Sequence, residues 1–312
     1  MTKTTPVAAE AVIHISGVHK HYGAVHAVNG VDLSIEPGEV FGLIGHNGAG
    51  KSTLFKMMLG LIPATRGEIR VGGALVQGPQ FRDVRRHMGY LPENVVLYDN
   101  LTGLETLHFF AKLKGVPTQQ CGAVLERVGL SHAADRAVQG YSKGMRQRLG
   151  FAQALLGQPK VLFLDEPTTG LDPQAIRSFY ATLKELRSQG VTMILTSHIL
   201  AELQERVDRL AIMAAGRIQA LGSVQALREQ VNMPLSVQVQ CPAHAVAEIQ
   251  TALSGLNLSV QTNSVTPLIL TMPCPRDQKM AVLRTLAGMA DLVQDIQVFE
   301  PSLEDVFFDF AA

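Results

Sequence analysis

Short apolar runs and helical repeats divide the first part of the chain into strands and helices. Strand-like runs occur at Val12–Ile15, Val31–Ile35 and Val40–Ile44, before a helical pattern begins at Ser52. The helical period dominates residues 80–157, and strand-like runs then return, alternating with helices, at Val161–Leu164, Val191–Thr196 and Leu210–Met213. Such alternation builds a mostly parallel sheet. The pattern therefore predicts an α/β fold with a β-rich entry and a helical insertion.

The helical insertion contains a clear start signal. Thr102 and Glu105 have the spacing of a capping box, in which each side chain bonds the backbone of the other residue. Apolar residues follow at helical spacing, including Leu104, Leu107 and Phe110. We therefore expect a helix that begins at Thr102.

The pattern changes near Pro234, where Leu235, Val237 and Val239 alternate with polar residues, as in a half-buried strand. The expected elements beyond this point are a strand, a helix (243–253), strands at 256–260 and 268–272, a helix (278–289) and a strand at 296–299. This is the βαββαβ order of a ferredoxin-like domain. We predict a first domain over residues 12–231 and a small C-terminal domain over residues 234–312, with a terminal helix capped at Ser302.

Composition narrows the class of protein. Apolar residues make up 46% and charged residues 17% of the 312 residues, as in a folded globular chain. Basic and acidic residues balance at 27 each, so we expect no nucleic-acid partner. The three cysteines are far apart, which suits free thiols. Since neither a signal peptide nor an 18-residue apolar run is present, we expect a cytoplasmic protein.

One run of residues predicts nucleotide binding. Residues 45–52 fit the phosphate-loop pattern G-x-x-x-x-G-K-[ST], between an expected strand and an expected helix. Backbone N–H groups of such a loop face the phosphates of ATP, Lys51 reaches the β- and γ-oxygens, and Ser52 is expected to ligate Mg²⁺. The alternative, a glycine-rich turn of chance origin, does not account for the flanking elements. The expected nucleotide contacts are Gly45, His46, Asn47, Gly48, Ala49, Gly50, Lys51, Ser52 and Thr53.

Two carboxylates end the expected strand Val161–Leu164. Ligands bind at the carboxyl ends of parallel strands, so Asp165 is expected to hold Mg²⁺ and Glu166 to polarise the attacking water as general base. Taken alone, an acidic pair at a strand end is usually solvated. The phosphate loop upstream makes the catalytic interpretation stronger.

The run from Tyr141 to Arg148, YSKGMRQR, resembles the signature motif of ATP-binding cassette (ABC) ATPases. Its variations are similar to the branch that serves ABC-2-type exporters. The resemblance implies a P-loop NTPase cassette with a RecA-like mixed sheet, a β-rich entry subdomain and a helical signature subdomain over about residues 80–157. It also implies that Ser142, Lys143, Gly144 and Met145 meet the nucleotide.

Four further positions carry family roles by the same resemblance. Asp172 lies in a D-loop-like run, and His198, in an H-loop-like run, is expected to contact the γ-phosphate and assist catalysis with Lys51. Tyr22 matches the aromatic residue that stacks on adenine, so GTP is expected to serve as well. Glu93 stands where the family usually has glutamine, and we expect it to bind Mg²⁺ or orient water.

The family resemblance also implies partners. Its signature motif faces the phosphate loop of another subunit, and one cassette per chain therefore implies a second copy of this chain, or a similar chain. The chain is expected to lie at the cytoplasmic face of the inner membrane, peripherally, beneath a polytopic permease. In the family such partners dock on the helical insertion, around Glu93 to Phe110.

The local sequence at His46, at Tyr90–Tyr98 and at Leu101–Leu107 is similar to that of the ATPase of the nitrous-oxide reductase maturation transporter. That resemblance implies a role in assembling a copper-sulfur centre, with a periplasmic protein reached through the permease. ATPases of other ABC-2-type exporters (drug, lipid or polysaccharide), soluble ABC ATPases and regulatory nucleotide-binding modules are the alternatives. Metal binding by the nearby His19, His21 and His26 is weighed too, and a structural role is favoured for these histidines.

Overall fold

The computed structural model describes residues 11–197, 200–231, 233–256, 258–263 and 268–311. Backbone contacts divide the chain into two compact units, the first ending at Val224 and the second spanning Gln225–Phe310. Each unit is described by itself.

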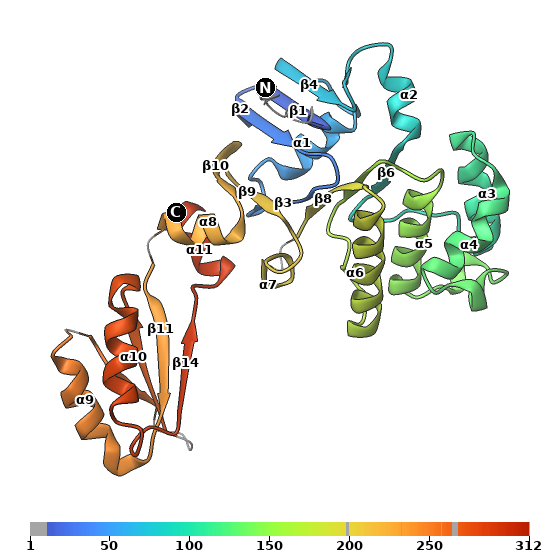
Figure 1. The fold of residues 1–312 in the computed structure, drawn as a ribbon. Helices are drawn as coiled ribbons and strands as arrows, with labels where there is room; N and C mark the ends of the chain where they lie inside the picture. Colours follow the sequence, from blue (N-terminus) through green and yellow to red (C-terminus); the bar gives the residue numbers. More distant parts are fainter. Residues whose placement is uncertain (1–10, 198–199, 232, 257, 264–267, 312) are drawn as a thin grey trace, which may run out of the picture. The chain divides into compact units, whose positions relative to one another are not determined.

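The first unit begins with an antiparallel sheet. Its strands pair in the order β2-β1-β4-β5 (Figure 1). Alternate side chains of the leading strand, such as Ile13 and Ile15, are buried, which gives the sheet one apolar face. The strands are β1 (Ile13–Tyr22), β2 (Val25–Ile35), β4 (Arg66–Val71) and β5 (Ala74–Leu75).

A second sheet forms the centre of this unit, in the order β10-β9-β3-β8-β7-β6. Its neighbours pair in parallel except for β10, which runs antiparallel to β9. The strands are β3 (Val40–Gly45), β6 (Met88–Leu91), β7 (Val161–Leu164), β8 (Thr192–Thr196), β9 (Arg209–Ala214) and β10 (Arg217–Gly222). The expectation that helical structure dominates residues 80–157 missed β6. This strand is too short for its period to be read, and it is defined by its pairing with β7.

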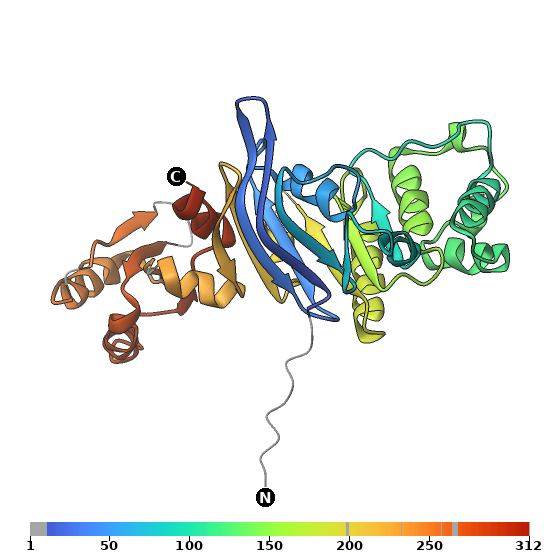
Figure 2. The same cartoon turned by 90° about the horizontal axis from the view of Figure 1, so that it is seen from above.

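Helices cover the central sheet and form a group beside it. Figure 2 shows α3, α4 and α5, in green, gathered at one side of the unit. Both bonds of the expected capping box are present: Glu105 N donates to Thr102 Oγ1 (3.1 Å), and Thr102 N donates to Glu105 Oε2 (2.8 Å). The helices are α1 (Lys51–Met58), α2 (Phe81–Arg86), α3 (Gly103–Lys114), α4 (Cys121–Arg127), α5 (Lys143–Leu155), α6 (Pro173–Ser188) and α7 (Leu200–Leu203).

Helix α1 joins the two sheets through one apolar core. Its buried side chains, Leu54, Phe55, Met57 and Met58, belong to the same cluster as residues of both sheets. The ring of Phe55 meets that of Phe163 of β7 edge to face, with centroids 5.6 Å apart. Truncating such an aromatic side chain in a core costs about 3–5 kcal/mol. This packing fixes the start of α1 against the central strands.

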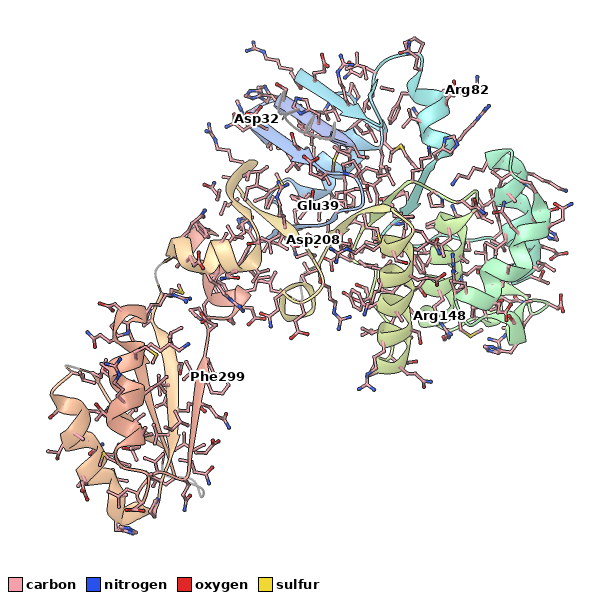
Figure 3. The ribbon with its side chains drawn as sticks, viewed as in Figure 1. Asp32, Glu39, Arg82, Arg148, Asp208 and Phe299 are labelled. Carbon is pink, nitrogen blue, oxygen red and sulfur yellow. The ribbon has the colours of Figure 1, made fainter. Side chains whose placement is uncertain are left out.

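Polar contacts hold the opposite, amino end of the central sheet. Val40 N donates to Asp208 Oδ2 (2.9 Å), and Glu39 lies 3.5 Å from the Arg209 guanidinium. Figure 3 labels Glu39 and Asp208 next to one another at the central strands. Burial raises the pKa of Glu39. The hydrogen bond from Glu36 N and the charge of Arg209 act in the opposite direction. These contacts anchor the sheet away from the predicted site.

The second unit has the ferredoxin-like topology expected from the sequence, with strand order β12-β13-β11-β14 and antiparallel pairing. Helices α9 and α10 bury Ile249, Leu253, Val282 and Leu286 in one cluster with the sheet. The elements are α8 (Val224–Val231), β11 (Leu235–Gln240), α9 (Val246–Ser254), β12 (Gln261–Asn263), β13 (Ile269–Cys274), α10 (Lys279–Ala287), β14 (Asp295–Phe299) and α11 (Leu303–Ala311).

One boundary in this unit differs from the sequence expectation. The second strand begins at Gln261, not at Leu256, because Leu256 N still donates to Leu253 O at the end of α9. The side chains of Leu256, Leu258 and Val260 pack on the core from outside the sheet. Their alternation therefore reflects burial rather than strand pairing. Within the residues described, no helix has the length and apolar character needed to cross a membrane.

Candidate functional site

The ends of four neighbouring strands bring the predicted site residues to one edge of the central sheet. In the sheet register Leu91 lies beside Leu164, Leu164 beside Leu195, and Leu43 beside Thr196. Because β6, β7, β8 and β3 are parallel, the segments that follow them start at the same edge. These segments carry Glu93, Asp165, the run after Thr196, and the phosphate loop.

The phosphate loop follows β3 and leads directly into α1. Two of its glycines are required by close backbone approach: a Cβ on Gly45 would lie 2.5 Å from Met213 O, and one on Gly50 would lie 2.3 Å from Ala27 O. Gly50 also has a left-handed φ of 104° at the N-cap of α1. The loop's centre, His46 to Gly48, is exposed, as is Ser52, whereas Ala49 is buried. The loop is thus fixed at its ends and open to a ligand along its middle.

Lys51 lies over this loop. Its Nζ donates to Gly45 O (2.5 Å) and to His46 O (3.2 Å). Burial lowers the pKa of Lys51, while the nearby Glu166, Asp165 and Glu93 carboxylates act to raise it, in that order. The structure therefore brings the lysine within electrostatic reach of three of the four acidic residues predicted for the site, Asp172 being the exception.

A buried hydroxyl joins the two carboxylate positions. Thr196 Oγ1, at the end of β8, donates to Asp165 Oδ1 (2.6 Å) and accepts from Glu166 N (2.9 Å). Glu166 has a positive φ of 48°, which is uncommon for a residue with a side chain and typical of functional sites. In the sequence, Thr196 begins the H-loop-like run that carries His198, but no role was predicted for its hydroxyl. Its place at the end of an apolar strand does not show which carboxylate it meets.

Tyr90 is a second residue that the sequence analysis did not assign to the site. It is the third residue of β6, two residues before the Pro92-Glu93 turn. Burial raises the pKa of its hydroxyl to about 12, and the charges of Asp165 and Glu93 act in the same direction. Glu93 itself is exposed. The phenol therefore stays neutral, within electrostatic reach of Asp165 and Glu93.

The signature run begins α5. Ser142 caps the helix by accepting from Met145 N (3.2 Å), and Lys143 and Gly144 pack against the loop at Gly170. The buried amide of Gln147 donates from Nε2 to Pro167 O (3.2 Å), directly after the acidic pair. Within one chain the signature helix is thus bonded to the loop that follows Glu166. Figures 1 and 2 both show α5 apart from α1, which carries the phosphate loop.

Three other predicted residues differ in their surroundings. Tyr22, at the tip of the β1–β2 hairpin, is 51% exposed, with Lys20 Nζ 5.0 Å from its ring centroid. Asp172 caps α6 by accepting from Ala175 N (2.8 Å). His198 lies outside the described residues.

The side chains at this edge fit Mg²⁺ bound together with ATP better than a metal ion held by protein ligands alone. Mg²⁺ prefers oxygen ligands and usually takes one or two from the protein and the rest from water and phosphates. The Ser52 hydroxyl and the Asp165 carboxylate offer oxygen atoms of this kind at one edge of the central sheet. In the described part of the chain no cluster of three or more His, Cys, Asp or Glu side chains can hold a metal ion. The ring centroids of His21 and His26 lie 4.0 Å apart, with the rings tilted by 38°. The structural role favoured for these histidines stays a prediction.

Comparisons with known proteins agree with the fold. A family model described as "ABC transporter" matches residues 28–169. The uncharacterized ABC transporter ATP-binding protein YhcH of Bacillus subtilis is 35% identical over 302 residues, 96% of either chain. The linearmycin resistance ATP-binding protein LnrL of the same species is 31% identical, covering 96% of this chain and 97% of its own.

Similarity also extends to part of a much larger protein and to solved structures. The human phospholipid-transporting ATPase ABCA7 is 36% identical over 91% of this chain, which spans only 14% of that protein. The solved ATP-binding subunit of an ABC transporter has a TM-score of 0.65 at 32% identity, over 70% of this chain and 92% of its own. CbiO1 of Clostridium perfringens, part of the cbiONQ complex, has a TM-score of 0.62 at 26% identity, over 72% and 95%.

Proposed function

We propose, since the chain belongs to the family of ABC transporter ATP-binding proteins, that it is the ATP-driven motor subunit of a membrane transporter. The family membership confirms the predicted cassette fold, ATP hydrolysis as the enzyme activity, and ATP with Mg²⁺ as the ligands. The roles of individual residues, the partners and the cargo are proposals.

The observation that carries the proposal is the Thr196 bridge between Asp165 and the Glu166 backbone, at the edge where Lys51 lies. In our proposal the exposed phosphate loop binds the β- and γ-phosphates, with Lys51 stabilising their charge. Glu166 orients the attacking water and accepts its proton, and His198 assists at the γ-phosphate. Mg²⁺, held by Ser52 and Asp165 with Glu93 nearby, would neutralise charge on the phosphates.

The separation of α5 from the phosphate loop supports a shared site. We propose that Ser142 to Met145 of a second copy complete the charge-stabilising surface, with Asp172 at the same junction, so that the working unit is a homodimer. The bond between Gln147 and Pro167 O would then connect signature contacts on one nucleotide to the acidic pair on the other. Tyr22 is proposed to stack on the adenine.

A groove in the helical part supports docking of a membrane partner. It has a volume of about 530 Å³ and is lined by apolar residues that include Val96 (87% exposed) and Leu113 (69% exposed). Tyr90 and Pro92 also line it, so the groove adjoins the turn that carries Glu93. We propose that a polytopic permease docks here and holds the chain at the cytoplasmic face of the inner membrane.

The predicted domain boundary at residues 231–234 also stays a proposal. Backbone contacts place α8, from Gln225 onward, with the second unit.

The substrate proposal rests on sequence resemblance. The local sequence around His46, Tyr90–Tyr98 and Leu101–Leu107 supports a role in a nitrous-oxide reductase maturation transporter of the ABC-2 branch. A periplasmic partner would be reached through the permease. An exporter of drugs or lipids is the second candidate, because LnrL is named for linearmycin resistance and ABCA7 for phospholipid transport. Deleting the gene and measuring the copper content of nitrous-oxide reductase separates the two candidates. Unchanged copper content would reject the first.

The catalytic proposal is tested by Glu166→Gln in the full chain. We expect ATP binding to be kept, turnover to be lost and a closed dimer to accumulate with ATP, measured by filter binding, phosphate release and size-exclusion chromatography. Glu248→Gln, an exposed position on α9, is the matched control and should behave as wild type. Wild-type turnover in Glu166→Gln would reject the general-base assignment.

A further inference from the structure

A basic depression lies next to the apolar groove. It is formed by Arg82, Arg85 and Arg86 of α2 and Lys114 of α3, together with Leu113 and Gly115. Its volume is about 290 Å³, and none of the described side chains that line it is acidic. In a chain with equal numbers of basic and acidic residues, four cations around one depression are a local concentration of charge.

The cations of this depression have few competing partners. Arg86 has an exposed ion pair with Asp83 at 3.7 Å, and exposed pairs of this kind contribute little. Arg85 lies over the ring of Phe81, with Cζ 5.1 Å from the centroid, a contact that leaves its N–H groups able to bind anions. Lys114 Nζ donates to Met88 O (3.0 Å) and Leu156 O (2.6 Å), and burial lowers its pKa to about 8, so the three arginines supply most of the charge. Figure 3 labels Arg82 beside α2 at the outer side of this unit.

We propose that this basic depression binds the phosphate headgroups of anionic lipids. Guanidinium groups match phosphate geometry, and a shallow surface of arginines suits mobile headgroups. The largely exposed Leu113 at its rim suits the apolar side of a membrane interface. An acidic protein segment is the competing occupant, but it would need a shaped cleft, and the adjoining groove is lined mainly by apolar residues.

The inference that this basic depression faces the membrane rests on the proposed function. The depression and the groove share Arg85, Leu113 and Lys114, so they open toward the same side of the first unit. If a permease segment occupies the groove, the depression faces the bilayer that contains the permease. Lipid headgroups would then hold the motor subunit beside its partner and strengthen docking.

The test is co-sedimentation of the full chain with vesicles. We expect binding to vesicles of phosphatidylglycerol and phosphatidylcholine, weakening with added salt, and little binding to phosphatidylcholine alone. The variant Arg82→Ala/Arg86→Ala should bind about thirtyfold more weakly, since each basic residue contributes about fivefold at an anionic surface. Its ATPase activity should be unchanged, because both side chains are exposed on α2 and neither belongs to the proposed catalytic site.

The control variant Lys184→Ala/Arg284→Ala removes the same charge from exposed positions on α6 and α10, and it should bind as wild type. Equal binding to both vesicle types, or wild-type binding by Arg82→Ala/Arg86→Ala, overturns the proposal. Loss of permease co-purification in detergent, without any change in vesicle binding, would identify an acidic protein segment instead and would also overturn it. If the chain binds these vesicles but no polytopic membrane protein co-purifies with it from cells, the proposed function is rejected and this inference stays intact.

Discussion

The buried hydroxyl of Thr196 offers the sharpest test of how the site is held. Valine has nearly the shape of threonine, so Thr196→Val removes the hydroxyl with little change in packing. The substitution leaves Asp165 Oδ1 and Glu166 N without that partner, next to a side chain with 0% exposure. An unsatisfied buried group costs about 1–3 kcal/mol, with bonds to charged groups at the upper end. We therefore expect the free energy of unfolding to fall by about 2–5 kcal/mol.

The same substitution should reduce catalysis separately from stability. The Glu166 backbone, held at a positive φ, loses the bond that fixes its N–H, and small misplacements of catalytic groups cost up to about 100-fold in rate. We expect kcat to fall about 10- to 100-fold while ATP still binds through the phosphate loop. Urea unfolding and phosphate-release kinetics on the same preparation measure the two effects.

Thr192→Val is the matched control on the same strand. Thr192 is also buried, and its Oγ1 accepts from Gly38 N (2.9 Å) at the other end of β8. We expect a loss of about 1–3 kcal/mol in stability, with kcat unchanged. If Thr196→Val unfolds like wild type and keeps its kcat, the hydroxyl does not position the acidic pair. If both variants lose kcat equally, the loss is caused by a general disturbance of β8 and not by the missing Thr196 hydroxyl.

Two further predictions concern the phosphate loop and pH. Gly50→Ala should abolish ATP binding in a filter assay, because its methyl group would lie 2.3 Å from Ala27 O, whereas Gly73→Ala, also at positive φ but with no atom within 4 Å, should still bind. The pKa of His21 is lowered, first by desolvation and then by the charge of His26, so the folded state binds fewer protons than the unfolded chain below about pH 6.5. Stability should therefore fall as the pH drops from about 6.5 through the folded pKa, and His21→Asn should flatten that slope in unfolding titrations; an identical slope would contradict the assignment.

Local signals in the sequence predicted much of this molecule. The capping box at Thr102, the loop ending at Lys51 and the acidic pair ending β7 each depend on residues within a few positions of one another. The βαββαβ order was likewise predicted from elements with clear periods, and the strand order agrees with it. Where burial and strand pairing diverge, as at Leu256, the period of apolar residues gave the wrong boundary.

The remaining parts of the site depend on which strands become neighbours, and a local pattern does not carry that information. Tyr90 reaches Asp165 only because β6 joins the central sheet beside β7, and Thr196 reaches the same carboxylate only because β8 lies on its other side. Glu93 acquires its influence on Lys51 by the same pairing. The effect of a substitution at Glu93 therefore depends on the pairing of β6 with β7. Glu93 is exposed, and its charge acts on Lys51 beside the proposed phosphate site. Glu93→Gln removes this negative charge, so we expect it to tighten ATP binding in a filter assay without altering stability.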